Sequence, residues 1–181
     1  GKNANVDEEF LNKMIIAGFA HDIGRKYSNG EDHGKISATM LENILINVKD
    51  IDILKNINTH SPVIVKFSIT CGDDNLSKVI EPNVCVSSKR FEAIKKLRDA
   101  GIYTGVLMMP LLPFINDTKD NIDKIINQAY KSMANFIYPM FGVTLRANQR
   151  FYYYTKLREN FPNLVSKYQN LYGDKYVCNS P

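Results

Sequence analysis

Four residues in the first sixty have side chains of the kind that bind a divalent metal. His21 and Asp22 are adjacent at the end of an apolar stretch, and His33 follows after a short polar segment. An imidazole beside a carboxylate is a typical ligand pair for a transition metal, and further histidines complete such a set. The alternative is that His21 and Asp22 end a helix and His33 is solvated. The predicted ligands of iron or manganese are His21, Asp22, His33 and His60.

Polar side chains also follow predicted strands further along the chain. Ser68 and Thr70 end an apolar strand, where they could hydrogen-bond a cofactor or substrate or simply face solvent. Arg146 follows a later strand, and its planar guanidinium suits a carboxylate or phosphate, although solvated or structural arginines are commoner. Glu81 lies in a long loop, where we expect an ion pair with Arg90 that fixes the loop. Ser68, Thr70, Glu81 and Arg146 are the candidate cofactor-binding residues, and no catalytic residue is predicted.

The residues before position 60 have helical periodicity. Apolar side chains recur at helical spacing from Glu8 to about Ala20 and again from Asp32 to Ile46, with a Ser-Asn-Gly turn between them. A third, short helix is expected from Asp50 to about Asn58. The first sixty residues therefore predict an all-helical segment.

The periodicity changes after residue 60. Residues 63–70 alternate between apolar and mostly polar side chains and contain several β-branched residues, as in a strand. The later segments predict a loop at 71–86, helices at 88–100, 119–133, 147–160 and 163–172, and strands at 102–109 and 135–145. The cap of the second helix is expected at Asn116, Asp117 or Thr118.

This alternation of strands and helices implies parallel strands joined by helical crossovers. The fold class predicted is α/β, a partial (β/α) barrel of about three parallel βα units preceded by the all-α segment. We place the boundary near residue 60, giving domains 1–60 and 61–181. In a parallel barrel the functional site lies at the carboxyl ends of the strands.

Composition narrows the class of protein. The 181 residues are 44% hydrophobic and 23% charged, with three widely spaced cysteines, which fits a globular protein in a reducing cytoplasm. We expect no membrane-spanning segment and no signal peptide. Residues 1–60 carry seven basic against nine acidic side chains, and residues 61–181 carry 16 against 10. This surplus alone does not predict nucleic-acid binding.

The segment AGFAHDIGR resembles the HD-domain phosphohydrolases, whose signature is His…His-Asp…Asp. His21 and Asp22 match the central pair, Gly24 continues the HDIG form, and His33 and His60 resemble additional histidines of some branches. No histidine precedes His21, and no later aspartate is marked as the final ligand. The resemblance implies a partial HD-like segment over about 1–60.

Residues 62–181 resemble the spore photoproduct lyase-like group of radical S-adenosylmethionine (SAM) proteins. The resemblance rests on IEPNV, RFEAIKKL, GVLMMPLLPFI, FGVTLR and the closing YVCNSP. It implies SAM and a [4Fe-4S] cluster bound by a CxxxCxxC loop, with the cofactors supplying the radical chemistry. The sequence contains no CxxxCxxC, so the expected site is incomplete.

Three hypotheses for the function follow. The first is a radical SAM-like protein represented by its C-terminal half, and the second is an HD-type metal-dependent phosphohydrolase segment. The third is a non-catalytic composite of two truncated domains. The chain alone is expected to be inactive under the first and third, and exposed strand edges predict self-association.

Overall fold

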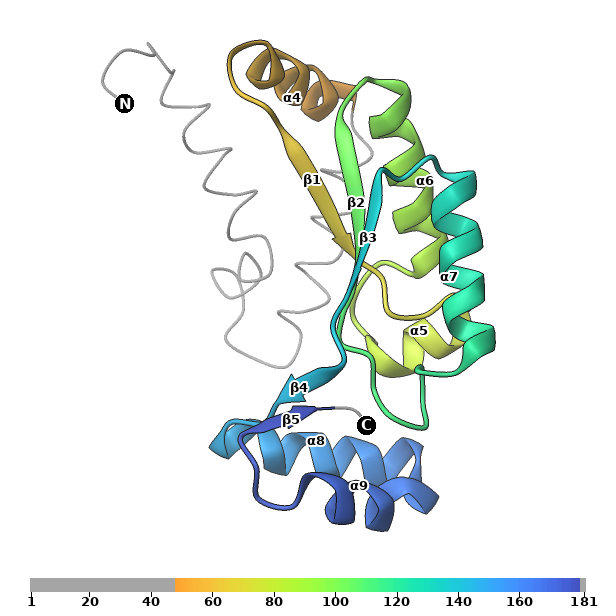
Figure 1. The fold of residues 1–181 in the computed structure, drawn as a ribbon, viewed down its shortest axis with the longest axis vertical. Helices are drawn as coiled ribbons and strands as arrows, with labels where there is room; N and C mark the ends of the chain where they lie inside the picture. Colours follow the sequence, from red (N-terminus) through yellow and green to blue (C-terminus); the bar gives the residue numbers. More distant parts are fainter. Residues whose placement is uncertain (1–47, 180–181) are drawn as a thin grey trace, which may run out of the picture.

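The computed structural model describes residues 48–179, which form a mixed α/β structure (Figure 1). Three parallel strands lie in the order β1-β2-β3: β1 (Ile64–Ser68), β2 (Tyr103–Met108) and β3 (Phe136–Pro139). Two short antiparallel strands, β4 (Gly142–Thr144) and β5 (Val177–Asn179), form a second sheet. The helices are α4 (Val48–His60), α5 (Asp74–Ile80), α6 (Ser87–Asp99), α7 (Lys119–Lys131), α8 (Ala147–Asn160), the short 3₁₀ helix η1 (Pro162–Leu164) and α9 (Val165–Tyr172).

Helices α6 and α7 pack on one face of the three-stranded sheet (Figure 1). Their buried side chains share one core with the strands: Phe91, Ile94 and Leu97 come from α6, and Ile125 and Ala129 from α7. These positions recur at the three- and four-residue spacing of an amphipathic helix, which is why one stripe of each helix is apolar. The parallel strand–helix–strand order expected from the sequence is confirmed.

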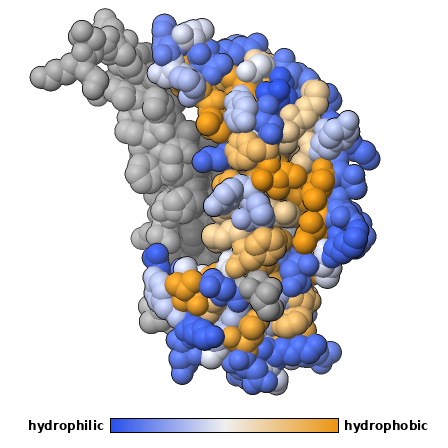
Figure 2. Space-filling model, viewed as in Figure 1, coloured by the Kyte–Doolittle hydropathy of each residue, from blue (hydrophilic) through white to orange (hydrophobic). Residues whose placement is uncertain are grey.

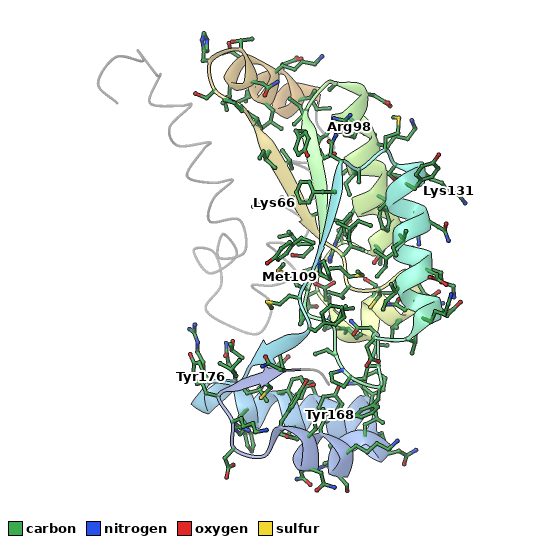
Figure 3. The ribbon with its side chains drawn as sticks, in the orientation of Figure 1. Lys66, Arg98, Met109, Lys131, Tyr168 and Tyr176 are labelled. Carbon is green, nitrogen blue, oxygen red and sulfur yellow. The ribbon has the colours of Figure 1, made fainter. Side chains whose placement is uncertain are left out.

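The opposite face of the sheet stays partly exposed. Ile64 is 56% exposed, Tyr103 46% and Tyr138 60%. Lys66 of the same sheet is labelled in Figure 3 on the side away from α6 and α7. In Figure 2 hydrophobic surface gathers over the middle of the molecule, where Figure 1 draws the strands, whereas the outer side of α7 is hydrophilic. The sheet therefore has one helix-covered face and one face with exposed apolar groups.

The strands β4 and β5 form a second packing unit with α8 and α9. Its buried core consists of Leu145, Leu157, Tyr168, Tyr172 and Cys178. Tyr168, labelled in Figure 3, is fully buried, and its hydroxyl donates a 2.5 Å hydrogen bond to the carbonyl of Pro113 in the loop after β2. Burial raises the pKa of Tyr168, so its hydroxyl stays protonated and serves as this donor. This bond joins the second unit to the main sheet.

Two expectations about the elements were wrong. The predicted loop 71–86 contains α5, whose N-cap Asp73 accepts hydrogen bonds from the backbone of Asn75 and Leu76. The predicted strand 135–145 is two strands in different sheets. The N–H of Met140 still donates to the carbonyl of Met108 in β2, and Gly142 then begins the second strand with a φ of 150°, a conformation that favours glycine. The other helices and strands expected after residue 60 lie within a few residues of the predicted bounds.

Helix α4 belongs partly to the core of the sheet, because Ile51 and Leu54 pack against it. The helices expected at 8–20 and 32–46 lie outside the described residues and stay predictions. The predicted domain boundary near residue 60 stays a prediction for the same reason. No helix in residues 48–179 combines the length and apolar character needed to cross a membrane.

Candidate functional site at the carboxyl edge of the sheet

The chain leaves β1 through a buried segment. Thr70 is 1% exposed and Cys71 is fully buried, whereas the side chain of Ser68 is exposed. The carbonyl of Thr70 accepts hydrogen bonds from the side-chain amides of Asn116 (3.2 Å) and Asn121 (3.0 Å). Its hydroxyl lies 3.6 Å from the sulfur of Cys71. Thr70 is thus held inside the structure, and of the two predicted strand-end residues only Ser68 presents its side chain to solvent.

Two buried asparagines organise this edge. The Asn121 side-chain oxygen accepts a 2.8 Å hydrogen bond from the N–H of Gly72, and its amide donates to the carbonyl of Asn116 at 2.6 Å. The Asn116 side-chain oxygen accepts from the N–H of Leu112. Two turns further along α7, Gln128 donates to the carbonyl of Gly72 at 2.8 Å. These side chains satisfy backbone groups that would otherwise be buried without a partner, which is costly.

The sequence interpretation missed this network. From the sequence, Asn116 was predicted only as one of three possible helix caps. The cap of α7 is another of the three, Thr118, whose hydroxyl accepts a hydrogen bond from the N–H of Asn121. Asn121 and Gln128 are polar residues in an amphipathic helix, where a solvated position is the ordinary expectation. The signal lay in their spacing, because residues seven apart share one face of a helix.

The expected ion pair between Glu81 and Arg90 is confirmed. A guanidinium nitrogen of Arg90 lies 3.0 Å from a carboxylate oxygen of Glu81. The Arg90 side chain is only 11% exposed and the Glu81 side chain 27%. Arg90 also donates to the carbonyls of Cys85 (2.7 Å) and Ser68. One side chain therefore ties the segment after α5 to the end of β1, as the fixed fork of an arginine allows.

The amino end of α6 is held by a residue from α5. The N-cap position Val86 has no side-chain acceptor, but Asp74 accepts from the Ser88 N–H (2.9 Å) and hydroxyl (2.6 Å). Desolvation opposes ionisation, yet these two hydrogen bonds from Ser88 hold the pKa of Asp74 below its usual value. The carboxylate also lies favourably at a helix amino terminus. The helix missed from the sequence thus positions the Arg90-bearing helix.

The remaining predicted residues do not join this edge. Arg146 is an exposed residue at the start of α8, beyond β4. His60 is exposed in the last turn of α4, which leads into the opposite, amino end of β1. His21, Asp22 and His33 lie outside the described residues, so their role stays a prediction. In residues 48–179 no group of three or more His, Cys, Asp or Glu side chains is placed to hold a metal ion.

The three cysteines do not fit a [4Fe-4S] cluster. Cys71, Cys85 and Cys178 are not paired in disulfides; Cys71 is fully buried in the segment after β1, and Cys178 is fully buried in the core of the second unit. Burial raises the pKa of the Cys71 thiol, although a hydrogen bond with Thr70 partly offsets this effect. Cluster iron is bound by several cysteine thiolates brought together, and in residues 48–179 no three His, Cys, Asp or Glu side chains gather to hold a metal. The described residues therefore supply no cluster site.

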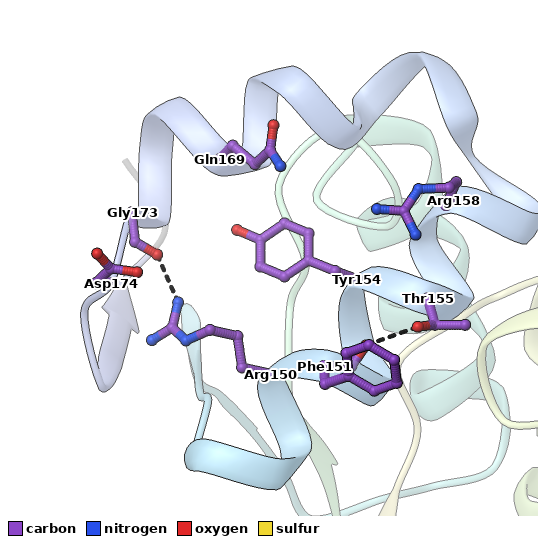
Figure 4. Close-up of a pocket in the computed structure, with 8 residues that line it drawn as sticks. All are labelled: Arg150, Phe151, Tyr154, Thr155, Arg158, Gln169, Gly173 and Asp174. Carbon is purple, nitrogen blue, oxygen red and sulfur yellow. Dashed lines mark hydrogen bonds between the residues drawn. The ribbon is translucent and has the colours of Figure 1, made fainter.

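A cavity of about 490 Å³ lies between α8 and α9, and Figure 4 shows the side chains that line it. The most conspicuous basic group is Arg150, whose guanidinium donates to the carbonyls of Gly173 and Lys175. In Figure 4 the dashed line from Arg150 to Gly173 marks the first of these bonds. Arg150 closes the turn after α9, so its role is structural.

Comparison with known proteins places similar sequence in longer chains. An uncharacterized protein of Mycobacterium tuberculosis (strain H37Rv), Rv2578c, is 28% identical over 124 residues, or 68% of this chain and 36% of that protein. Uncharacterized protein MJ0683 of Methanocaldococcus jannaschii is 31% identical over 115 residues, or 64% of this chain and 40% of that protein. Uncharacterized protein ORF301 of Acidianus two-tailed virus is 26% identical over 87 residues, covering 48% of this chain and 28% of that protein. No family model and no solved structure matches.

Over these matches the chain spans well under half of each relative's length. The fold and the site thus define a mixed α/β protein with an ordered carboxyl edge on a three-stranded parallel sheet.

Proposed function

We propose that residues 62–181 are the C-terminal part of a radical SAM-like (β/α) barrel, preceded by a partial HD-like segment. The observation that carries the proposal is the parallel sheet β1-β2-β3 with helices packed on one face and an ordered polar network at its carboxyl edge. That arrangement is the repeating unit of a (β/α) barrel, in which substrates bind at the carboxyl edge. The sequence resemblance to the spore photoproduct lyase-like group supports the same assignment.

In this proposal the chain contributes a wall of the site and not its radical chemistry. SAM bound to a cluster would supply the radical, but the cysteines here do not fit the cluster. Ser68 offers an exposed hydroxyl at the strand end, and Glu81 and Arg90 fix the segment beside it. Thr70 acts through its backbone carbonyl in the network beneath. The chain alone is therefore proposed to be catalytically inactive.

A comparison of three proteins tests this proposal: the chain itself, MJ0683, and a chimera of MJ0683 in which the matching 115 residues are replaced by those of this chain. Each is reconstituted anaerobically with iron and sulfide, and the cluster absorption and bound iron are measured. We expect a cluster in MJ0683 and in the chimera and none in the chain alone. No cluster in MJ0683, or a stoichiometric cluster in this chain alone, would contradict the proposal.

The predicted metal site is tested separately. Metal analysis of the purified chain beside a His21→Ala variant measures bound iron and manganese. Stoichiometric metal that is lost in the variant would support an HD-type site, and equal metal content in both would exclude His21 as a ligand. Phosphohydrolase activity is proposed only through this metal site, because three of its predicted ligands, His21, Asp22 and His33, lie outside the described residues.

Self-association is proposed from the two outer strands. Within the described residues, β1 and β3 each pair with β2 on one side only. Unpaired strand edges are templates for pairing with a second chain. We expect a dimer or larger species by light scattering, and a monomer across a wide concentration range would refute this.

A further inference from the structure

A larger cavity, of about 660 Å³, lies between α5, the loop after β2, strand β4 and helix α8. Figure 1 shows α5 and α8 in the same half of the molecule, beyond the carboxyl end of β1. A volume of this size falls within the range of about 300–1,000 Å³ typical of small-molecule sites. The cavity meets the network around Thr70 at Leu112, whose N–H bonds to Asn116, and it shares no lining residue with the cavity of Figure 4.

The inner wall of this cavity is apolar. Leu112, Leu145 and Leu157 are 7%, 3% and 4% exposed, so their side chains belong to the packed interior behind it. The half-buried side chains of Ile115 and Phe161 continue the same wall. Binding to such a wall stabilises a ligand in proportion to the apolar area removed from water. The wall therefore suits an aromatic or branched aliphatic body.

The charged groups at the opening are unequal in sign. Lys156 lies 2.7 Å from Glu159, which balances its charge, and it also lies 5.9 Å from the ring centroid of Tyr152. Lys78, in the last turn of α5, is exposed and has no ion pair in the described part of the chain. Asp74, one turn earlier, directs its carboxylate to Ser88. The charges of Asp74 and Lys78 interact, but no carboxylate forms an ion pair with Lys78 in the described residues, so its ammonium group can meet an anion at the opening.

We propose that this cavity binds a small amphipathic anion, with its apolar body against the leucine wall and a single carboxylate or sulfonate at Lys78. The apolar wall and a lysine with no ion pair in the described residues together define the ligand class, because a neutral hydrocarbon would make no contact with the ammonium group of Lys78. A polyanion would in turn meet Glu159. The inference is independent of the radical SAM-like assignment, since it uses no side chain of the carboxyl-edge network.

The test uses 8-anilinonaphthalene-1-sulfonate, an aromatic sulfonate whose fluorescence rises in apolar surroundings, titrated into the full chain. We expect saturable binding of one dye per chain, displaced by 1-naphthoate but not by the uncharged 1-naphthalenemethanol. Lys78→Glu reverses the charge at the opening and should weaken dye binding about fivefold or more, since attraction becomes repulsion. Lys131→Glu is the matched control, because Lys131 is an exposed lysine in the last turn of α7 outside this cavity, and should leave binding unchanged.

A second variant pair tests the cavity itself. Val79 and Val84 are both 43% exposed, but only Val79 lines the cavity. Val79→Trp should occupy part of the volume and abolish saturable dye binding, whereas Val84→Trp should not, with near-ultraviolet circular dichroism confirming that both variants fold. Binding unchanged in both Val79→Trp and Lys78→Glu would overturn the proposal. The absence of saturable binding in the full chain would also overturn it, because another segment would then occupy the cavity. Release of dye as the protein concentration rises would overturn it too, because a second copy would then occupy the cavity.

Discussion

Replacement of Asn121 by alanine measures how much the carboxyl-edge network stabilises the fold. The Asn121 side chain is 5% exposed and makes hydrogen bonds with the Gly72 N–H and the carbonyls of Thr70 and Asn116. Each such bond contributes about 1 kcal/mol net, and a buried group left without a partner costs somewhat more. Alanine is the better helix former by roughly 0.5 kcal/mol, which offsets part of the loss. We therefore expect Asn121→Ala to lower the free energy of unfolding by about 2–3 kcal/mol.

Urea denaturation followed by circular dichroism measures this change, and an unaltered slope would show that the unfolded state is unaffected. Asn127→Ala is the matched control, since Asn127 is an exposed asparagine on the same helix. The control should be neutral or slightly stabilising because only helix propensity changes. A loss below about 1 kcal/mol for Asn121→Ala, or an equal loss in the control, would refute the view that this network orders the edge.

Three further substitutions test the neighbouring contacts. Gly72→Ala should destabilise by about 1–3 kcal/mol in urea, because the added Cβ would overlap the Cβ of Lys124. Asp74→Asn should cost about 1 kcal/mol at pH 7 through weaker capping of Ser88. Since the folded pKa of Asp74 is lowered, its stabilisation is present above the ordinary value of 3.8 and is lost as pH falls through the folded pKa, so the difference between wild type and variant should shrink at acid pH. Arg90→Lys should lower the melting temperature, because an ammonium cannot reproduce the guanidinium fork; an unchanged melting temperature would contradict the structural role.

The parallel sheet and its two covering helices could be predicted because their periodicities are strong and local. Alternation at 63–70 and the three- and four-residue spacing in 88–100 and 119–133 each report which side of an element is buried. The Glu81–Arg90 pair could also be predicted, since a long loop beside a helix needs a fixed anchor. These features depend on residues close together in sequence.

The features that could not be predicted depend on partners far apart in the chain. Strand β5 forms by pairing with β4, and this pairing needs a glycine at position 142, because a Cβ there would collide with the carbonyl of Cys178. Residues 177–179 alone contain no signal that predicts this pairing. Likewise, Asn121 reaches the carbonyl of a residue 51 positions earlier. The break in the predicted strand 135–145 is different, because Gly142 was a local signal that the prediction overlooked.

The exposed face of the sheet bears on the proposed barrel. Parallel sheets are normally covered on both faces, yet Ile64, Tyr103 and Tyr138 stay about half exposed on the face away from α6 and α7. Strands β1 and β3 also have one unpaired edge each among the described residues. Closure of a barrel would bury the inner face and pair both edges in one step, whereas a flat sheet packed between helices would need a separate cover for each. The proposed barrel predicts that the remaining strands lie in sequence outside the matches, which cover well under half of each longer relative.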